Sequence, residues 1–500
     1  MSMARPLVIR GGRVLDVARR AAAEADILLA GDTIAEIGRP GLAAPADAEA
    51  VDARGFLLHP GLVNAHTHGH SNLSKAPGDL WTLELLLAAG PWISGGRGVE
   101  EKYLSALLGA CEMLLKGCTA AYDLMIEIPA PSKDGVHAAA RGYMDAGMRA
   151  VIAPTAADMT LYTSVPGLLD ALPPALRREV EAMAPAPASA ALAAVRGILE
   201  DWPFDRARVR PAVAPAIPLL CSDEFVVACR DLAREFDLGL HTHLLESKVQ
   251  AVVGRTRYGM SVTRYLDKMG VLGPRFTGAH GVWTDEEDMR VLAGAGANIA
   301  HNPGSNMRLG NGIARVKRMR ELGVNVGIGT DSVTCSDNLN MYEAMRLAAM
   351  SSRVQSPDTG RWLAAEDCLL QATEASARAL GFERIGRLAP GYKADIVFLD
   401  LGAINWIPYG DPVNRIVNLE DGTSVDSVMV GGRFAVRHRK LVHVDLARLK
   451  DRAETAWAGV SARVAEKRAL FDRLAPAVNA FCPAVAARPY HVDRYPAHGA

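Results

Sequence analysis

The sequence predicts an α/β fold in which a (β/α)8 barrel carries a small composite β-sandwich formed by both chain ends. Three observations predict it. The length of 500 residues suits a barrel of roughly 250 residues or more with a satellite domain. The middle of the chain alternates short apolar strands with helix-like segments. The two ends share a different pattern, in which short strands are separated by glycine turns.

Both chain ends are rich in β-branched runs. PLVIRGGRVLD and ADILLAGDTIAEIG near the start are similar in style to GRLAPGYKADIVFLDL and SVDSVMVGGRFAVRHRKLV near the end. This pattern is typical of short strands in a meander. We therefore expect residues 1–59 and 386–445 to form one β-sandwich, with residues 60–385 inserted as the barrel. Residues 446–500 should form an amphipathic helix and a tail whose last dozen residues are loosely ordered.

The inserted region contains eight candidate strands, which is the number that a closed barrel requires. They lie at residues 61–66, 119–123, 149–154, 209–215, 239–243, 276–280, 297–303 and 324–331. Residues 155–205 are rich in Ala and Pro and are long for one loop. They are expected to carry irregular chain and helices near the active face, or else to be a surface linker.

Composition excludes several classes of protein. Hydrophobic residues make up 49% of the chain and charged residues 22%, as in globular proteins. The 55 basic and 56 acidic residues give a net charge of −1, so a nucleic-acid or membrane partner is not expected. Seven dispersed cysteines without a C-x-x-C pair indicate buried thiols in a reducing compartment. With no signal peptide or long apolar run, the sequence predicts a cytoplasmic protein.

Several predicted strands end in residues that bind metals or transfer protons, at the end where barrel enzymes place catalysis. His66 and His68 are two apart on an extended strand, so both imidazoles point to the same side. The fifth strand ends in HTHLLE, which supplies His243 and Glu246, and the eighth ends in GTD at Asp331. Three histidines and an aspartate with an open position for water are typical of a catalytic divalent metal site.

Five motifs occur together in an order that resembles the amidohydrolase superfamily, within it the branch of triazine hydrolases, guanine deaminase and methylthioadenosine/S-adenosylhomocysteine deaminase. The match spans most of the chain. The motifs are PGLVNAHTH (60–68), HTHLLE (241–246), GAH (278–280), HNPGSNMRLGNG (301–312) and GTDS with CSDNLNM (329–341). The resemblance implies a metal-dependent hydrolase on a TIM barrel, and a homo-oligomer.

Carried over to these motifs, the resemblance implies one divalent metal, Zn²⁺ or alternatively Fe²⁺, bound by His66, His68, His243 and Asp331. It also implies three catalytic residues. Glu246 protonates a ring nitrogen or the leaving group, and His280 polarises the water or the substrate. Asp331 accepts a proton from the metal-activated water and passes it on. Binuclear relatives use a carboxylated lysine, but the fourth strand reads VRPAVAPA and contains no lysine, which favours one metal.

Substrate contacts are carried over from the HNPGSN motif, where Asn302, Ser305 and Asn306 occupy positions that line the pocket in this branch. Ser305 could equally be a helix N-cap. His301 either contacts substrate or anchors this loop.

Two further histidines have structural interpretations. We interpret His241 as a hydrogen-bonded histidine of the strand and His70 as an exposed loop residue.

The predicted reaction is hydrolysis of a C–N bond in a nitrogen heterocycle, most simply deamination of a small amino-substituted ring. Dechlorination or amide-bond hydrolysis by the same site is the alternative, and a catalytically silent binding module is a remote one. The segment around Trp81 and Trp92 departs from the better-known deaminases, which leaves the substrate open.

Overall fold

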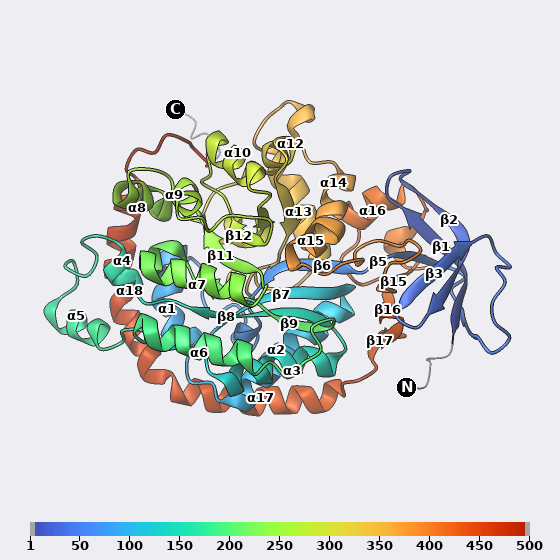
Figure 1. Ribbon diagram of the computed structural model, residues 1–500, viewed down its shortest axis with the longest axis horizontal. Coiled ribbons are helices and arrows are strands. Elements are labelled where there is room, and N and C mark those ends of the chain that lie inside the picture. Colours follow the sequence, from blue (N-terminus) through green and yellow to red (C-terminus); the bar gives the residue numbers. More distant parts are fainter. Residues whose placement is uncertain (1–5, 496–500) are drawn as a thin grey trace.

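The computed structural model describes residues 6–495, and all eight predicted barrel strands are present (Figure 1). The fourth is split in two. They are β6 (Leu62–Thr67), β7 (Cys118–Ile126), β8 (Arg149–Ala156), β9 (Val209–Pro211) with β10 (Ala214–Pro215), β11 (Leu240–Leu244), β12 (Phe276–His280), β13 (Asn298–His301) and β14 (Asn325–Ile328).

The barrel strands form a closed parallel ring in chain order. One run of pairing joins β6, β7, β8, β9 and β10, and another joins β11, β12, β13 and β14. Parallel bridges link Val213 to Leu240 and Thr67 to Asp331, so that the two runs meet at both edges. At the second junction the Asp331 amide donates to the carbonyl of His66 at 2.9 Å. The predicted (β/α)8 barrel is confirmed, and its closure places the first and last ligand strands side by side.

Helices cover the outside of this barrel, as Figure 1 shows. Several begin at a polar N-cap; the hydroxyl of Ser222, for example, accepts a hydrogen bond from the Phe225 amide and fixes the start of its helix. The helices are α2 (Val99–Leu115), α3 (Lys133–Ala146), α6 (Ala188–Glu200), α7 (Asp223–Glu235), α8 (Lys248–Tyr258), α9 (Val262–Lys268), α10 (Glu286–Gly294), α11 (Pro303–Arg308), α12 (Val316–Glu321), α13 (Met341–Arg353), α14 (Ala365–Leu370) and α15 (Ser376–Leu380).

Both chain ends contribute to one nine-stranded sheet in the order β18-β17-β16-β15-β5-β1-β2-β3, with β4 paired to β1. Its buried cluster includes Ile9 from the start of the chain and Phe398 from the end. Strand β5 runs almost directly into β6, which connects the sheet to the barrel. The strands are β1 (Leu7–Asp16), β2 (Ala21–Ala30), β3 (Thr33–Gly38), β4 (Glu49–Asp52), β5 (Phe56–Pro60), β15 (Ile396–Asp400), β16 (Val425–Val430), β17 (Arg433–Arg437) and β18 (Lys440–Leu441).

Additional helices surround the carboxyl end of the barrel and its flank. α1 (Leu83–Ile93) follows β6, and residues 155–205 contain α4 (Leu161–Ser164) and α5 (Pro174–Glu181) besides α6. The C-terminal helices α17 (Leu446–Arg463) and α18 (Ala465–Ala486) wrap around the outside of the barrel, where α18 contacts α1 and α8 (Figure 1). No helix within residues 6–495 is long and apolar enough to cross a membrane.

The C-terminal tail differs from the sequence-based expectation. Residues 489–495 pack against the barrel, where Arg494 is only 6% exposed. The rings of Tyr490 and Tyr495 have their centroids 6.1 and 5.3 Å from that of Trp283. The sequence of this tail is polar, and such a sequence gives no sign that the tail packs against a loop distant in the chain, so the expectation of a loose tail was wrong for residues 489–495. Residues 496–500 of the expected loose tail lie outside the described residues.

Candidate active site

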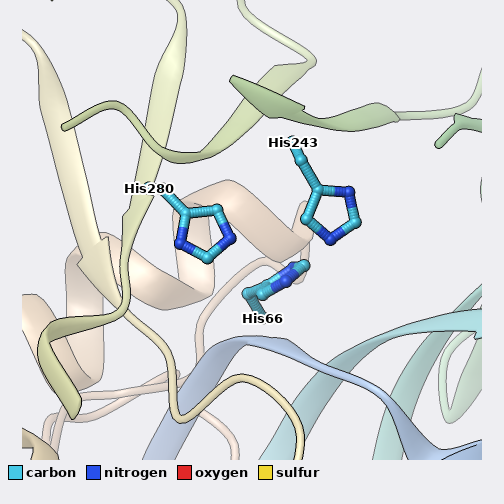
Figure 2. A group of neighbouring side chains, drawn as sticks. All are labelled: His66, His243 and His280. Carbon is cyan, nitrogen blue, oxygen red and sulfur yellow. The ribbon is translucent and has the colours of Figure 1, made fainter. Parts of the chain in front are cut away.

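Polar side chains from four strand ends converge at the carboxyl end of the barrel. Figure 2 shows the rings of His66, His243 and His280 turned toward a common point, and each ring offers a nitrogen within 4.8 Å of the others. Asp331 Oδ1 lies 3.4 Å from His66 Nε2 and 3.3 Å from His68 Nε2. The Nε2 atoms of His68 and His243 are 3.2 Å apart. The four residues predicted as metal ligands therefore lie in one buried cluster.

Backbone carbonyls fix the protonation of two of these rings. His68 Nδ1 lies 2.7 Å from the carbonyl of Leu124, and His243 Nδ1 lies 2.6 Å from that of Ala216. A carbonyl only accepts, so Nδ1 carries the proton in both residues. The lone pair of each Nε2 then points into the cluster. This is the tautomer in which imidazoles coordinate metals, with the outer nitrogen held by a carbonyl.

His66 is fully buried, and neither of its ring nitrogens has a hydrogen-bond partner. Burial lowers the pKa of His66 to about 4 although Asp331 acts in the opposite direction. The ring is therefore neutral near pH 7, with its lone pair available. An unpaired buried nitrogen is costly unless something satisfies it. Burial keeps the rings of His66 and His243 neutral, whereas Asp331 raises the pKa of His68 against the effect of burial, so a metal would displace any proton from His68 Nε2. Three imidazoles and a carboxylate fit the requirements of a divalent metal such as zinc.

Two residues of the site have unusual backbone conformations. His280 and Asp331 have φ values of 74° and 61°, in the left-handed region that side chains rarely adopt. Such strain is concentrated where it aims a functional group. Gly329 makes the approach of β14 to β6 possible, because a Cβ there would lie 2.4 Å from Asn302 Oδ1 and 2.8 Å from the His66 amide nitrogen.

The predicted proton-transfer residues lie beside the cluster. Glu246 Oε2 is 3.5 Å from His280 Nε2, and that nitrogen is 3.8 Å from Asp331 Oδ2. The side-chain amide of Asn311 donates from Nδ2 to Glu246 Oε1 at 3.1 Å. Burial raises the pKa of Glu246 well above its usual value, and the charges of Asp331 and Glu84 add to this effect. The carboxyl group is therefore suited to remain protonated and to act as an acid.

Residues of the HNPGSN motif hold His280. Its Nδ1 lies 2.9 Å from Asn306 Oδ1, which directs Nε2 toward Glu246. Asn302 Nδ2 lies 3.4 Å from the same Nδ1. Ser305 is buried inside α11, where its hydroxyl contacts Cys335 Sγ at 3.5 Å. The N-cap of α11 is Asn302, so the alternative interpretation of Ser305 as a cap is wrong.

Three other histidines surround the site. His301 ends β13, and its carbonyl accepts the Gly329 amide at 2.9 Å, so it contributes to the close contact at β14. The interpretation of His241 as a hydrogen-bonded histidine is wrong: neither of its ring nitrogens has a partner, and its ring packs against that of His66 with the centroids 5.0 Å apart. His70 is buried, in contrast to the expected exposed loop. Its Nδ1 accepts the Ile126 amide at 3.2 Å, because β7 extends past the end of β6 and covers it.

Some residues near the site were not singled out from the sequence. Gln250 Oε1 accepts the Glu246 amide at 2.8 Å, and the Ser247 hydroxyl donates to Glu84 Oε1 at 2.7 Å. Gln250 follows Glu246 by only four residues, and Asn311 lies inside the HNPGSNMRLGNG motif, so both could have been suspected. Glu84 lies far from them along the chain, and no local pattern marks it.

A narrow pocket lies beside the Glu246 side of the site. Glu84, Ser164 and Gln250 provide its polar groups, and the hydroxyl of Ser164 and Nε2 of Gln250 have no partner. The other walls are aliphatic: Leu83, Leu87, Leu161, Val165, Ile217, Leu219, Leu220 and Val249. The volume of about 20 Å³ has room for about one water molecule and is too small for a heterocycle.

Comparisons with known proteins show which family and fold this chain matches. Residues 57–435 match the model of the Amidohydrolase family. A 5'-deoxyadenosine deaminase from Methanothermobacter thermautotrophicus is 32% identical over 90% of this chain and 98% of its own length. A 5-methylthioadenosine/S-adenosylhomocysteine deaminase from Dictyoglomus thermophilum is 30% identical over 81% and 87%, respectively.

Solved structures show the same fold. The zinc complex of an atrazine chlorohydrolase from Arthrobacter aurescens TC1 superposes with a TM-score of 0.79 and 28% identity, over 90% of this chain and all of its own. An adenosine deaminase from Xanthomonas campestris with bound zinc gives a TM-score of 0.78 at 24% identity, over 91% and 98% of the two chains.

Proposed function

Because the chain belongs to the amidohydrolase family, we propose that His66, His68, His243 and Asp331 hold the single divalent metal on which its activity depends. The chain is a metal-dependent hydrolase that acts on a C–N bond of a nitrogen heterocycle. We propose zinc as the metal, with iron as the alternative. The observation that carries the proposal is the protonatable Glu246 carboxyl 3.5 Å from His280, at the edge of a cluster of buried imidazoles.

A divalent metal at these ligands supplies the Lewis acidity that makes water nucleophilic near neutral pH. The other functions belong to side chains. Asp331 would accept the proton of the attacking water, because the carboxylate is ionised: His66 and His68 hold its pKa well below the usual value against the effect of burial. Glu246 protonates a ring nitrogen and the departing amine. His280, held by Asn306, would polarise the water or the substrate between these two carboxyl groups.

We propose an amino-substituted nitrogen heterocycle as the substrate and ammonia as the product. Two relatives carry names of deaminases that act on adenine-containing compounds. His301, Asn302, Ser305 and Asn306 would contact the ring from the side of β13 and α11. Hydrolytic dechlorination is the second candidate, because a chlorohydrolase shares the fold and chloride loss needs the same activated water. Amide-bond hydrolysis would use the same residues.

Ammonia release across a panel of aminopurines, pterins, aminopyrimidines and aminotriazines tests the reaction. We expect release from at least one ring class by the metal-loaded protein. Activity on chlorinated rings or cyclic amides, together with silence on every amine, would refute deamination. Silence on all of them would refute the hydrolase assignment and favour a binding module.

Metal analysis tests the ligand set independently of activity. Wild-type protein should contain one metal per chain, and His243→Ala should lose most of it. His438→Ala is a suitable control, because the side chain of His438 is 76% exposed and lies outside the site. Full metal content in His243→Ala would contradict the proposed ligands.

We also propose that the protein is a cytoplasmic homo-oligomer with three regions: residues 1–59 with 386–445, residues 60–385, and residues 446–500. The seven buried, unpaired cysteines support a reducing compartment. Light scattering coupled to size-exclusion chromatography would determine the oligomeric state.

A further inference from the structure

The C-terminal tail carries a buried arginine, Arg494, that contacts two loops next to the active site. Arg494 donates from Nε to the carbonyl of Val282 at 2.9 Å, from Nη2 to that of Thr284 at 2.5 Å and from Nη1 to that of Asp493 at 3.0 Å. It forms no ion pair with a carboxylate among the described residues. Burial lowers the pKa of Arg494 to about 10, so it remains charged near pH 7. A buried cation held only by carbonyls is costly and calls for a role beyond filling space.

Each of the two loops that Arg494 joins forms a hydrogen bond to residue 245 or 246. The first, residues 281–285, follows His280, and its Trp283 amide donates to the carbonyl of Leu245 at 2.9 Å. The second, residues 309–315, contains Asn311, the residue that donates to Glu246. Trp283 connects the loops directly, because its Nε1 donates to the Asn311 carbonyl at 2.8 Å.

The backbone of Arg494 contacts the second loop as well. Its carbonyl accepts the Ile313 amide at 2.8 Å. Gly312 allows this approach, because its φ is 102° and a Cβ there would lie 2.9 Å from the same carbonyl oxygen. The tail therefore attaches to both loops. Figure 1 shows its course, as the chain leaves α18 and crosses toward α10.

Both proton-transfer residues depend on the second loop. The backbone amide of Asn311 donates to the backbone carbonyl of Asn306 at 2.8 Å, and the side chain of Asn306 holds His280. The side chain of Asn311 holds Glu246. A shift of this loop would move Glu246 and His280 together, whereas β6, β11 and β14 would continue to support the predicted metal ligands.

We propose that Arg494 is a positioning residue for Glu246 and His280, acting through residues 281–285 and 309–315. The proposal rests on the proton-transfer roles given above. Its two consequences are that the C-terminal tail belongs to the active-site architecture and that its loss impairs turnover more than metal binding.

Arg494→Met removes the guanidinium and keeps the length of the side chain, and Arg488→Met makes the same change at an exposed position of the same tail. We expect Arg494→Met to keep its metal and to lose roughly 10- to 100-fold in kcat with little change in KM, as misplacing catalytic groups by about 1 Å can do. Equal losses in the two variants, or loss of metal from Arg494→Met, would overturn the proposal.

A double-mutant cycle with Asn311→Ala separates positioning from general destabilisation. If Arg494 acts through Asn311, the second substitution should add much less than its single effect, whereas independent effects multiply. Multiplying effects would overturn the proposal.

Hydrogen exchange gives a readout that does not depend on turnover. Amides in residues 281–285 and 309–315 should exchange roughly tenfold faster in Arg494→Met than in Arg488→Met, because their anchor is lost. Unchanged exchange would overturn the proposal even if the enzyme is active. Inactivity of the wild-type protein would instead refute the proposed function, and the exchange result would still test whether Arg494 holds the loops.

Discussion

Replacing Glu246 by glutamine removes the proposed acid and leaves most of the surrounding contacts possible. The side-chain amide of Asn311, which donates to Glu246 Oε1 at 3.1 Å, can donate equally to the glutamine Oε1. The backbone amide of residue 246 keeps its bond to Gln250. Only the second oxygen changes, the one 3.5 Å from His280 Nε2. An amide there can hydrogen-bond but cannot deliver a proton to a leaving amine.

Positioned acid–base catalysis contributes about 10²- to 10⁴-fold, so kcat for ammonia release should fall by that factor, equivalent to about 3–5 kcal/mol of transition-state stabilisation. KM should change little, because the lost interaction forms during the reaction. Steady-state ammonia release and metal content, measured on the same preparation, check both statements. Glu343→Gln is the matched control: it alters a half-buried carboxyl outside the site, one that accepts from the Asn338 side chain at 2.7 Å, and it should lose far less. A Glu246→Gln enzyme with kcat within threefold or so of wild type would refute the acid role.

Three other predictions concern the close approach at Gly329, the pH dependence of activity and a buried carboxylate in β2. Gly329→Ala should weaken metal binding and lower the free energy of unfolding by about 1–3 kcal/mol, because the new Cβ would clash with Asn302 and His66. Metal titration and thermal melting would measure these two effects, and a wild-type melting temperature would contradict the prediction. Wild-type activity should fall at high pH as Glu246, whose pKa is raised chiefly by burial, loses its proton; a profile flat on the alkaline side would argue against the role. Asp26 accepts from Arg10 at 2.6 Å and from three backbone amides, which outweigh burial and lower its pKa. Its stabilising effect should be present above the unfolded pKa of about 3.9 and be lost as pH falls through the lower folded value. Urea melts should show that Asp26→Asn costs about 2–4 kcal/mol at pH 7 and no longer has this acid dependence.

The barrel could be predicted because its strands are marked locally. Each buried strand is a short apolar run, and the ones that carry chemistry end in a polar residue, as at His66, His243 and His280. Spacing two apart on a strand was enough to pair His66 with His68. These signals are local in sequence, and the closed ring then brings the strand ends together.

The supporting contacts could not be predicted in the same way. Glu84 and Arg494 approach the site from segments that follow β6 and α18, and nothing in their neighbouring residues identifies their partners. His70 has a loop-like sequence but is buried, because the length of β7 decides its exposure. Tertiary packing determines these positions.

The sheet formed by both ends of the chain cannot be completed until late in synthesis. Leu58 of β5 pairs with Phe398 of β15, a partner 340 residues later in the chain. At translation speeds of about 5–20 residues per second, roughly 17–70 s pass between the synthesis of β5 and the synthesis of β15. During that interval an apolar strand has an unpaired edge, which favours aggregation. Low temperature, slow expression or added chaperones should therefore raise the yield of active protein more than any change at the catalytic centre.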